Sequence, residues 1–582
     1  MTDKRIDRRQ LLAGAGAATA VLAASAASAA TSTAAAAPAA KWDYETDVLC
    51  IGSGAAACSA AVAAIDNGAR AMLVEKMPML GGTTGKSGGV TWIANNFALR
   101  KAGIDDKKDD ALRYMARYGY PLTYDPASPT LGLDERQYRV LEAFYDNGYK
   151  AVDRLTELGA TAFKEFRLFN LDRDTPDYAD HLPENKTPTR RTLEPAVGAG
   201  SSNGGGSLAA QLAAYLEAKK VPILTDTRVS RIVIENGRVI GVEATQNDKP
   251  IRIRARRGVV FGTGGYAHNT DLIAQHQFAS PIYGACAMPG STGDFIEMAQ
   301  EIGAKMGPLG TAWRTQVLLE EALDSRAIGL GAFVLPGDSM ILVNKYGNRC
   351  VNEKRDYNDR TQAHFPYDPT REEFPNHLMF MLFDERSIDA FGGDFPFPLD
   401  KGEQPYLIQG NSWDEVFAGI AQRLDKVKGK TGGVALNAEF ATNAKAAMAR
   451  FNGYAKAGAD PEFKRGEHLY DREWHMLFSM RREGTKQPVN PYPNVTMHPI
   501  AEKGPFYAFI LGPGALDTSG GPLINEKAQV LGRGDKPIQG LYGAGNCIAA
   551  PTHTAYLGAG GTIGPALTFG FIAGTHAAKD IA

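Results

Sequence analysis

The chain has 582 residues, with 63 basic and 65 acidic side chains and a formal net charge of −2. This length suffices for a large domain and a second one, and the balanced charge argues against a nucleic-acid partner. The five cysteines stand singly, without a C-x-x-C pair, so the sequence predicts no iron–sulfur cluster, zinc site, c-type haem or disulfide framework.

Residues 1–40 are predicted to be an export signal. Arg8 and Arg9 precede a weakly apolar, Ala-rich stretch with A-x-A sites such as 27–29. This pattern is typical of a twin-arginine signal, and an ordinary secretory signal with incidental arginines is the alternative. The stretch is short and rich in Ala and Gly, so we expect no permanent membrane anchor. The expected location is periplasmic or extracellular.

The next segment predicts a β–α–β unit. Residues 46–52 form a buried-strand run, 55–67 a helix of small residues, and a second strand ends at Glu75. The G-x-G-x-x-A turn at Gly52 and Gly54 allows backbone to approach a pyrophosphate at the helix N-terminus. An acid at the end of the second strand can accept ribose hydroxyls. The unit therefore predicts a Rossmann-type dinucleotide site.

A stretch rich in glycine and hydroxyl groups follows this unit. Residues 81–84 and 87–89 supply donors without bulk, which a flavin edge needs and NAD alone does not, so FAD is the expected cofactor. No histidine occurs between residues 41 and 180, so we expect noncovalent binding. The residues expected to contact FAD are Gly52, Gly54, Ala55, Ala56, Glu75, Lys76, Gly82, Thr83, Thr84, Ser87, Gly88, Gly89, Arg228, Gly264, Gly265, Asp294, Gly545, Asn546, Gly561, Thr562 and Ile563.

The rest of the chain predicts an α/β fold: a Rossmann-type FAD-binding domain with an inserted α+β cap. The domain is expected over 41–310 and 496–582, and the cap over 311–495, where Pro, Phe, Tyr and charge become more frequent. The expected elements are a helix over 204–220, a hairpin over 228–244 with an Asn236-Gly237 turn, a strand over 258–265, helices near 413–427 and 438–457, and an apolar helix near 561–578.

These motifs resemble the flavoprotein superfamily of fumarate reductases and 3-ketosteroid dehydrogenases. The resemblance covers most of residues 44–582 and includes Ser-Thr-Gly-Asp at 291–294, the segment 341–353 and the C-terminal Gly-Ala-Gly-Asn block. Fumarate reductases carry a proton-delivering arginine after the Val-Asn-Glu motif. Tyr357 stands there in this chain, although Arg355 or Arg360 could take the place with a small shift.

Two further positions separate the branches of the superfamily. The arginine of the C-terminal Asn-Arg-Leu-Gly-Gly stretch of fumarate reductases is replaced here by Tyr556, and their His-x-Thr-Met-Gly-Gly stretch reads as residues 516–521 without a histidine. A phenol cannot pair with a dianion as arginine does, but it can donate to a neutral carbonyl. The pattern is similar to 3-ketosteroid Δ1-dehydrogenases, whose Tyr-x-Gly-x-Gly-x-Thr-Ile-Gly-Pro motif matches residues 556–565.

The resemblance implies removal of two hydrogens from the carbons α and β to a ketone, most specifically a 3-ketosteroid. Tyr556 and the Gly560 N–H would bind the ketone oxygen, Tyr357 would remove the α-proton, and flavin N5 would accept a hydride. A tyrosine with a pKa of about 10 is a weak base at neutral pH and needs a helper. The family implies a tyrosine of the FAD domain: Tyr118 by preference, or Tyr114, four residues apart on one helical face.

Several points stay open. Arg355 is a candidate for lowering the pKa of Tyr357, and Δ1 or Δ4 regiochemistry and other cyclic ketones are not distinguished. Electrons must pass to a separate acceptor, a quinone or a redox protein. The first rival is an exported, fumarate-reductase-like enzyme that reduces an activated C=C bond, against which the missing arginine and histidine count. The second is a flavin-binding scaffold without catalysis.

Overall fold

The α/β domain is built on an eight-stranded sheet. The computed structural model describes residues 41–168, 172–196, 204–399, 402, 404–479 and 489–580, so the expected export signal lies outside the described residues. The sheet order is β15-β16-β8-β9-β1-β2-β6, with β7 on β8, and the strands β16, β9, β1, β2 and β6 run parallel. Its strands are β1 (Tyr44–Ile51), β2 (Ala71–Val74), β6 (Ile223–Leu224), β7 (Thr227–Glu235), β8 (Arg238–Gln246), β9 (Lys249–Phe261), β15 (Gln529–Leu531) and β16 (Pro537–Gly543).

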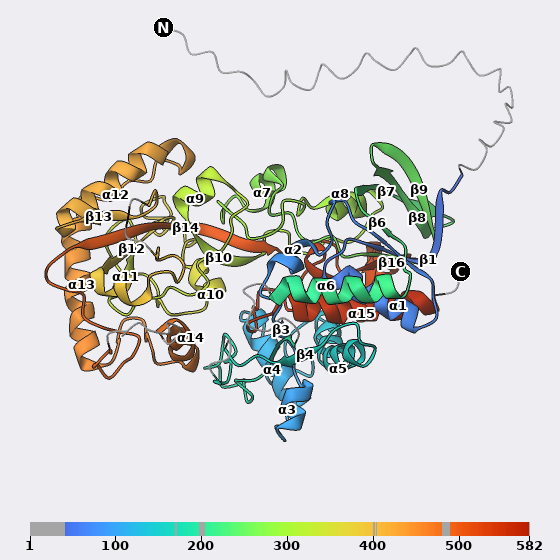
Figure 1. Ribbon diagram of the computed structural model, residues 1–582, viewed down its shortest axis with the longest axis horizontal. Helices are drawn as coiled ribbons and strands as arrows, with labels where there is room; N and C mark the ends of the chain where they lie inside the picture. The colour runs from blue at the N-terminus through green and yellow to red at the C-terminus, as the bar shows by residue number, and fades with distance from the viewer. Residues whose placement is uncertain are drawn as a thin grey trace, which may run out of the picture. The chain divides into compact units, whose positions relative to one another are not determined.

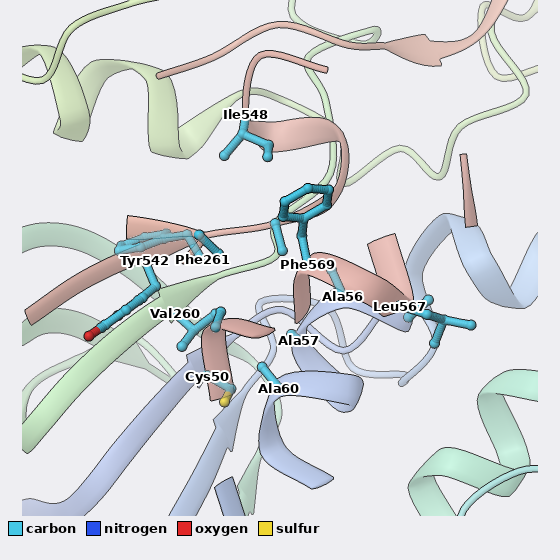
Figure 2. Close-up of a cluster of buried hydrophobic side chains, with 14 of the residues drawn as sticks. Cys50, Ala56, Ala57, Ala60, Val260, Phe261, Tyr542, Ile548, Leu567 and Phe569 are labelled. Atoms are coloured by element: carbon cyan, nitrogen blue, oxygen red, sulfur yellow. The ribbon is translucent and has the colours of Figure 1, made fainter. Parts of the chain in front are cut away.

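Two helices of small residues pack closely on this sheet. A Cβ at Gly570 of α15 (Ile563–Lys579) would lie 2.2 Å from the carbonyl oxygen of Ala56 in α1 (Ala55–Asp66), so a side chain there would push the helices apart. Figure 2 places Ala56 in one buried cluster with Phe261 and Leu567. The close packing explains the alanine and glycine runs and fixes the N-terminus of α1 at the end of β1.

A small antiparallel sheet and its helices extend the α/β domain. Its order is β3-β5-β4, with β3 (Thr91–Trp92), β5 (Thr192–Pro195) and β4 (Phe163–Glu165). Arg191 is fully buried there and forms ion pairs of 2.6 Å with Asp106 and Asp177. Asp177 also accepts from the Trp92 indole N–H at 2.8 Å, which fixes the irregular segment that contains Asp177.

The cap is built on a five-stranded antiparallel sheet of order β10-β14-β12-β11, with β13 on β14. Figure 1 shows β14 as a long strand that leads from the cap back toward the α/β domain. Because β14 pairs along the cap sheet up to Thr518, this sheet extends beyond the expected cap boundary at 495. The strands are β10 (Ala312–Leu318), β11 (Met340–Val343), β12 (Met379–Asp384), β13 (Ile408–Gly410) and β14 (Phe506–Thr518).

Helices cover both sheets. They are α2 (Gly82–Lys86), α3 (Phe97–Lys101), α4 (Lys108–Gly119), α5 (Glu135–Glu157), α6 (Gly204–Ala218), α7 (Thr270–His276), α8 (Asp294–Glu301), α9 (Leu319–Asp324), α10 (Tyr357–Gln362), α11 (Glu385–Phe391), α12 (Trp413–Val427), α13 (Phe440–Ala457) and α14 (Leu469–Ser479), with short 3-10 turns η1 (Lys428–Lys430), η2 (Arg533–Asp535) and η3 (Gly545–Cys547). The expected helices, the hairpin and the α/β fold with a cap are confirmed; the expected strand over 258–265 is the end of the longer β9. Within the described ranges, no helix combines the length and the apolar character needed to cross a bilayer.

Candidate functional site

A cavity of about 1040 Å³ lies at the carboxyl ends of the parallel strands, where α1 begins. Its lining combines the turn after β1 with α2, the end of β9 and the C-terminal segment before α15. The expected FAD-contacting residues found in the lining are Gly52, Gly54, Ala55, Ala56, Glu75, Lys76, Gly82, Thr83, Thr84, Ser87, Gly264, Asp294, Gly545, Asn546, Thr562 and Ile563.

Five expected contacts lie elsewhere. Gly88, Gly89, Gly265 and Gly561 are outside the lining, although each is next to or near a lining residue. Position 228 is also displaced: Val229 lines the cavity, whereas the adjacent Arg228 points to Asp294 and forms a 3.0 Å ion pair with it. Successive side chains of a strand point to opposite faces of the sheet, so a prediction that is wrong by one residue selects a side chain that points away from the cavity.

The turn at the start of α1 fits a dinucleotide. Gly52 has φ +101°, and a Cβ there would lie 2.5 Å from the carbonyl oxygen of Gly262, so only glycine keeps this approach of backbone to backbone. The first turn of α1 has no acidic residue, and among its N–H groups that of Ala55 donates to the Thr84 hydroxyl at 3.0 Å. The other N–H groups of this turn and the helix dipole can bind an anion such as pyrophosphate. This cradle fits FAD.

The acid at the end of β2 is held in place by the protein. One oxygen of the Glu75 carboxylate accepts from the Ser53 hydroxyl at 2.6 Å and the other from the Met77 N–H at 2.8 Å. Glu75 lines the cavity and retains lone pairs for ribose hydroxyls, because a carboxylate offers about four acceptor sites. Lys76 is occupied by Thr292 at 2.7 Å and Asp294 at 2.9 Å. The roles of Glu75 and Lys76 stay predictions.

Three buried tyrosines from distant parts of the chain meet between the α/β domain and the cap. Tyr357 begins α10, Tyr556 lies in the loop before α15, and Tyr178 lies in the irregular segment held by Arg191. The Tyr178 hydroxyl donates to that of Tyr357 at 2.9 Å, and the Tyr178 and Tyr556 rings stack with centroids 5.3 Å apart. Tyr357 meets Tyr556 edge to face at 5.4 Å.

The hydroxyl bonded to Tyr357 is not one of the two expected helpers, whose catalytic roles stay predictions. Tyr118 and Tyr114 do stack on one face of α4, but the Tyr118 hydroxyl donates to Asp359 at 3.0 Å and that of Tyr114 to the Leu557 carbonyl at 2.8 Å. The hydroxyl beside Tyr357 belongs to Tyr178, which sequence reasoning missed. The hydrophobic residues of 174–179 do not recur with the spacing of a helix or a strand, so the sequence alone could not indicate where the Tyr178 side chain points.

Burial dominates the acidity of these hydroxyls. It raises the pKa of Tyr357 well above its usual range, and negative charge on Tyr178 or Tyr556 raises it further. Burial also raises the pKa of Tyr556, whereas its hydrogen bonds with Tyr357 and Thr562 lower this pKa and offset part of the effect of burial. The expectation that Arg355 lowers the pKa of Tyr357 is not supported, because its charge acts on the pKa of Tyr118 and Tyr470 instead.

Arg355 instead joins the two sides of the tyrosine cluster. Its guanidinium donates to the main-chain carbonyl of Tyr178, and its Nε lies 3.4 Å from the Asp356 carboxylate. Asp356 is fully buried and caps α10 by accepting from the Asp359 N–H at 3.0 Å. Burial, followed by repulsion from Asp359, raises the pKa of Asp356 to about 8. Arg355 therefore ties the segment of Tyr178 to the start of α10.

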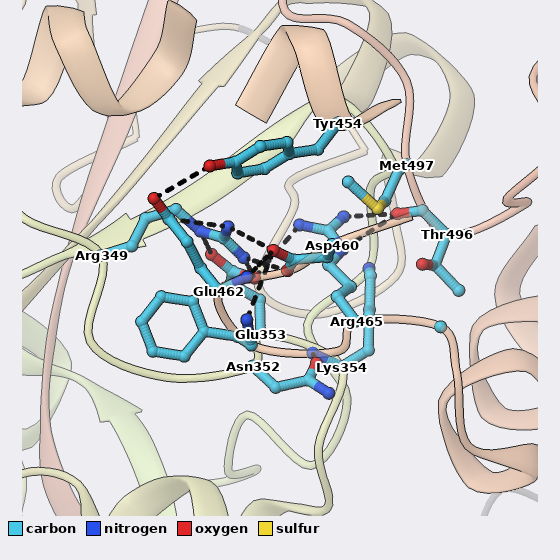
Figure 3. Close-up of polar contacts among 12 residues, drawn as sticks. Arg349, Asn352, Glu353, Lys354, Tyr454, Asp460, Glu462, Arg465, Thr496 and Met497 are labelled. Carbon is cyan, nitrogen blue, oxygen red and sulfur yellow. Dashed lines mark hydrogen bonds and ion pairs between the residues drawn. The ribbon is translucent and has the colours of Figure 1, made fainter. Parts of the chain in front are cut away.

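A buried ionic cluster anchors the chain just before Tyr357 (Figure 3). Glu353 accepts from Arg349 at 2.8 Å, and Arg349 also pairs with Asp460 at 2.8 Å. Arg465 donates to the Met340 carbonyl at 2.7 Å. Burial opposes the charge of Glu353, but Arg349 and Arg465 outweigh it and lower its pKa to about 2. The cluster fixes the strand-to-helix segment that delivers Tyr357.

Gly560 lies four residues after Tyr556, in the loop before α15. Its φ is +89°, and a Cβ there would lie 2.4 Å from the main chain of Val90, so the position requires glycine. No hydrogen-bond partner of the Gly560 N–H is found in the part of the chain that the structure describes. The described residues also contain no group of histidine, cysteine and carboxylate side chains that could hold a metal ion.

Comparisons with known proteins show the family to which this chain belongs. The family model described as "FAD binding domain" matches residues 47–563. A 4-oxocyclohexanecarboxylate 2-dehydrogenase of Sinomonas cyclohexanicum is 31% identical, over 92% of this chain and 93% of its own length. A 3-oxosteroid 1-dehydrogenase of Mycolicibacterium smegmatis is also 31% identical, over 92% of this chain and 97% of its own.

One solved structure is similar over nearly the same range. It is the 3-ketosteroid Δ1-dehydrogenase of Sterolibacterium denitrificans in complex with 1,4-androstadiene-3,17-dione. The alignment has a TM-score of 0.74 and 26% identity and covers 92% of this chain and 100% of that one. The α/β domain with its cap is therefore shared with a flavoprotein dehydrogenase.

Proposed function

The chain belongs to the FAD binding domain family and binds FAD, and we propose that it catalyses the FAD-dependent α,β-dehydrogenation of a cyclic ketone. The observation that carries the proposal is the tyrosine cluster, in which Tyr178, Tyr357 and Tyr556 meet. The names of the two relatives at 31% identity support this reaction class.

The ketone oxygen accepts hydrogen bonds from the Tyr556 hydroxyl and the Gly560 N–H. Negative charge grows on this oxygen as the α-proton leaves, so two fixed donors stabilise the transition state more than the ground state. Both groups belong to the loop before α15, and the positive φ of Gly560 restricts the conformation of the main chain that carries its N–H.

Tyr357 removes the α-proton in its ionised form. Burial keeps that form rare, so the donor at 2.9 Å on Tyr178 matters: it stabilises the Tyr357 phenolate by a charge-assisted hydrogen bond. When bound, FAD supplies the acceptor for the hydride that leaves the β-carbon.

The cluster around the tyrosines favours an apolar ring system. The hydrophobic side chains packed around the tyrosines are Val90, Phe166, Leu168, Trp313, Phe333, Val334, Tyr470, Trp474, Leu516, Ala550 and Ala559. A large apolar ring system can bury its surface against these side chains, so we propose a 3-ketosteroid as the substrate class. Δ1 dehydrogenation is the proposed outcome.

The test is anaerobic mixing of the oxidised holoprotein with one ketone at a time while the flavin absorbance is followed. We expect bleaching with androst-4-ene-3,17-dione, weaker bleaching with 4-oxocyclohexanecarboxylate and none with succinate. Tyr556→Phe should retain FAD and lose most of the rate, whereas Tyr215→Phe on the surface of α6 should behave as wild type. Full activity of Tyr556→Phe would refute the carbonyl site, and rapid turnover of fumarate with a reduced dye would favour the reductase alternative.

We also propose that FAD is held noncovalently and that the protein is exported by the twin-arginine route. The support for export is the Arg8-Arg9 pair before the Ala-rich stretch, which lies outside the described residues. Replacing both arginines by lysine should retain the protein in the cytoplasm. Unchanged export of that variant would favour the ordinary secretory signal.

A further inference from the structure

A second cavity lies beside the cofactor cavity. Its walls come from the end of α4, the start of α5 and three loops. The lining residues are Tyr120, Arg136, Gln137, Val140, Pro308, Thr311, Ser519, Leu523, Ile524, Ala549, Ala550, Pro551 and His553.

Two short stretches of chain form a common wall between the cavities. Asp517 and Asn546 line the cofactor cavity, whereas Ser519 and Ala549 line the second one. An extended chain advances at most about 3.6 Å per residue, so stretches of two and three residues span at most about 7 and 11 Å. A molecule in the second cavity therefore lies close to the bound cofactor.

The lining offers a flat aromatic surface and a single cation. The His553 ring stacks on Tyr120 with centroids 4.7 Å apart, and burial lowers the pKa of His553, which keeps the ring neutral. Arg136 is the one lining residue with a formal charge. Over the described residues, no carboxylate pairs with its guanidinium.

A buried hydroxyl without a partner also belongs to this lining. Ser519 is 2% exposed, and its Oγ has no hydrogen-bond partner among the described residues. A buried hydroxyl without a partner destabilises the fold, so a ligand or a water molecule that bonds to it is expected.

We propose that this cavity binds a quinone, which reoxidises the cofactor. A quinone is planar and apolar, so its ring can stack on an aromatic surface such as that of Tyr120 and His553. Its two carbonyl oxygens accept hydrogen bonds, which Ser519 and Arg136 can donate. The uncharged ring needs no counterion, and the guanidinium stabilises the negative charge that arises on the oxygens during reduction.

The proposed step balances. Ketone oxidation leaves two electrons and one proton on the cofactor and releases the second proton through Tyr357. The quinone takes up the two electrons, that cofactor proton and one proton from solvent, and leaves as the hydroquinone. The sum is ketone plus quinone giving enone plus hydroquinone.

The experiment separates this step from ketone chemistry. The holoprotein is reduced with stoichiometric dithionite, without ketone, and mixed anaerobically with 2,3-dimethoxy-5-methyl-1,4-benzoquinone while flavin absorbance returns. Calorimetry with the same quinone and oxidised holoprotein gives the dissociation constant. The variants are Arg136→Met, which removes the cation, and Leu523→Trp, which fills the cavity. The matched control is Arg139→Met, which removes a surface charge from the same helix, outside the cavity, where Arg139 pairs with Glu135.

A lost hydrogen bond from a charged donor is worth about 1.5–3 kcal/mol, so Arg136→Met should weaken quinone binding and slow reoxidation about 10- to 100-fold. Leu523→Trp should do the same and Arg139→Met should change neither. Arg136 is in the first turn of α5, where a cation opposes the helix dipole, so its removal should not destabilise the fold. Unchanged reoxidation in both cavity variants would overturn the proposal. An equal loss in ketone-driven bleaching would also overturn it, because the cavity would then serve the ketone.

Discussion

Replacing Tyr178 by phenylalanine tests how the base is activated. The substitution keeps the ring, which stacks on Tyr556 and meets Tyr470 edge to face at 5.1 Å, and removes only the hydroxyl that donates to Tyr357 at 2.9 Å. We expect the variant to fold and to bind FAD as wild type does. Its proton-abstraction step should be slow.

The magnitude follows from the charge on the acceptor. A hydrogen bond to an ionised group contributes about 1.5–3 kcal/mol, which is a factor of about 10–100 in the population of the Tyr357 phenolate. Burial already raises the pKa of Tyr357. Because the Tyr178 hydroxyl donates to Tyr357, we expect the loss of this donor to raise the pKa of Tyr357 further. In the proposed mechanism the phenolate of Tyr357 is the active form, so we expect the rate at neutral pH to fall and the limb of the pH profile to move to higher pH.

The assay is stopped-flow bleaching of oxidised flavin by ketone between about pH 6 and pH 10, where an unperturbed tyrosine begins to ionise. The control is Tyr118→Phe. This variant also removes one tyrosine hydroxyl, but in the wild type that hydroxyl donates to Asp359. We expect the pH limb to move in Tyr178→Phe and to stay in place in Tyr118→Phe. A reduced rate without a shift in Tyr178→Phe would refute the reasoning, because the hydroxyl would then have no effect on the pKa of the base.

Three further predictions use other parts of the molecule. Asp356→Asn keeps a side chain that caps helices well at the start of α10. Burial raises the pKa of Asp356 from 3.8 to about 8 in the folded protein, so the wild type should lose stability relative to the variant as pH rises between these values. The measurement is the difference in Tm between the two proteins at pH 5 and at pH 8. A Tm difference that does not change with pH would contradict this. Gly52→Ala places a Cβ 2.5 Å from the Gly262 carbonyl oxygen and should abolish FAD binding, seen as loss of flavin absorbance per protein; full occupancy would contradict the tight turn. Acid precipitation of the holoprotein should release FAD into the supernatant, whereas flavin retained in the pellet would indicate a covalent bond.

The local parts of the fold could be predicted from the sequence. The glycine turn at Gly52 and Gly54, the helix of small residues after it and the hairpin around Asn236 depend on periodicity and turn chemistry within a few residues. These features account for most of the cofactor cavity, because that cavity is built from turns at the ends of neighbouring strands. The end of the cap sheet could not be predicted, because the pairing of β14 with β10 joins residues about 200 positions apart.

The helper of the base shows why a site can be harder to predict than a fold. Tyr118 had the better local argument, since it lies on a regular helix four residues after Tyr114. Tyr178 reaches Tyr357 only because Arg191 holds Asp177 from one side and Arg355 binds the Tyr178 carbonyl from the other. Arg355 is 177 residues from Tyr178, whereas Arg191 is 14 residues from Asp177, and neither contact follows from a helix or strand period. The position of the Tyr178 hydroxyl therefore depends on the packing of the cap against the α/β domain. We expect a substitution of Arg355 to change the pH profile of the reaction, although among the described residues no hydrogen bond joins the Arg355 side chain to Tyr357.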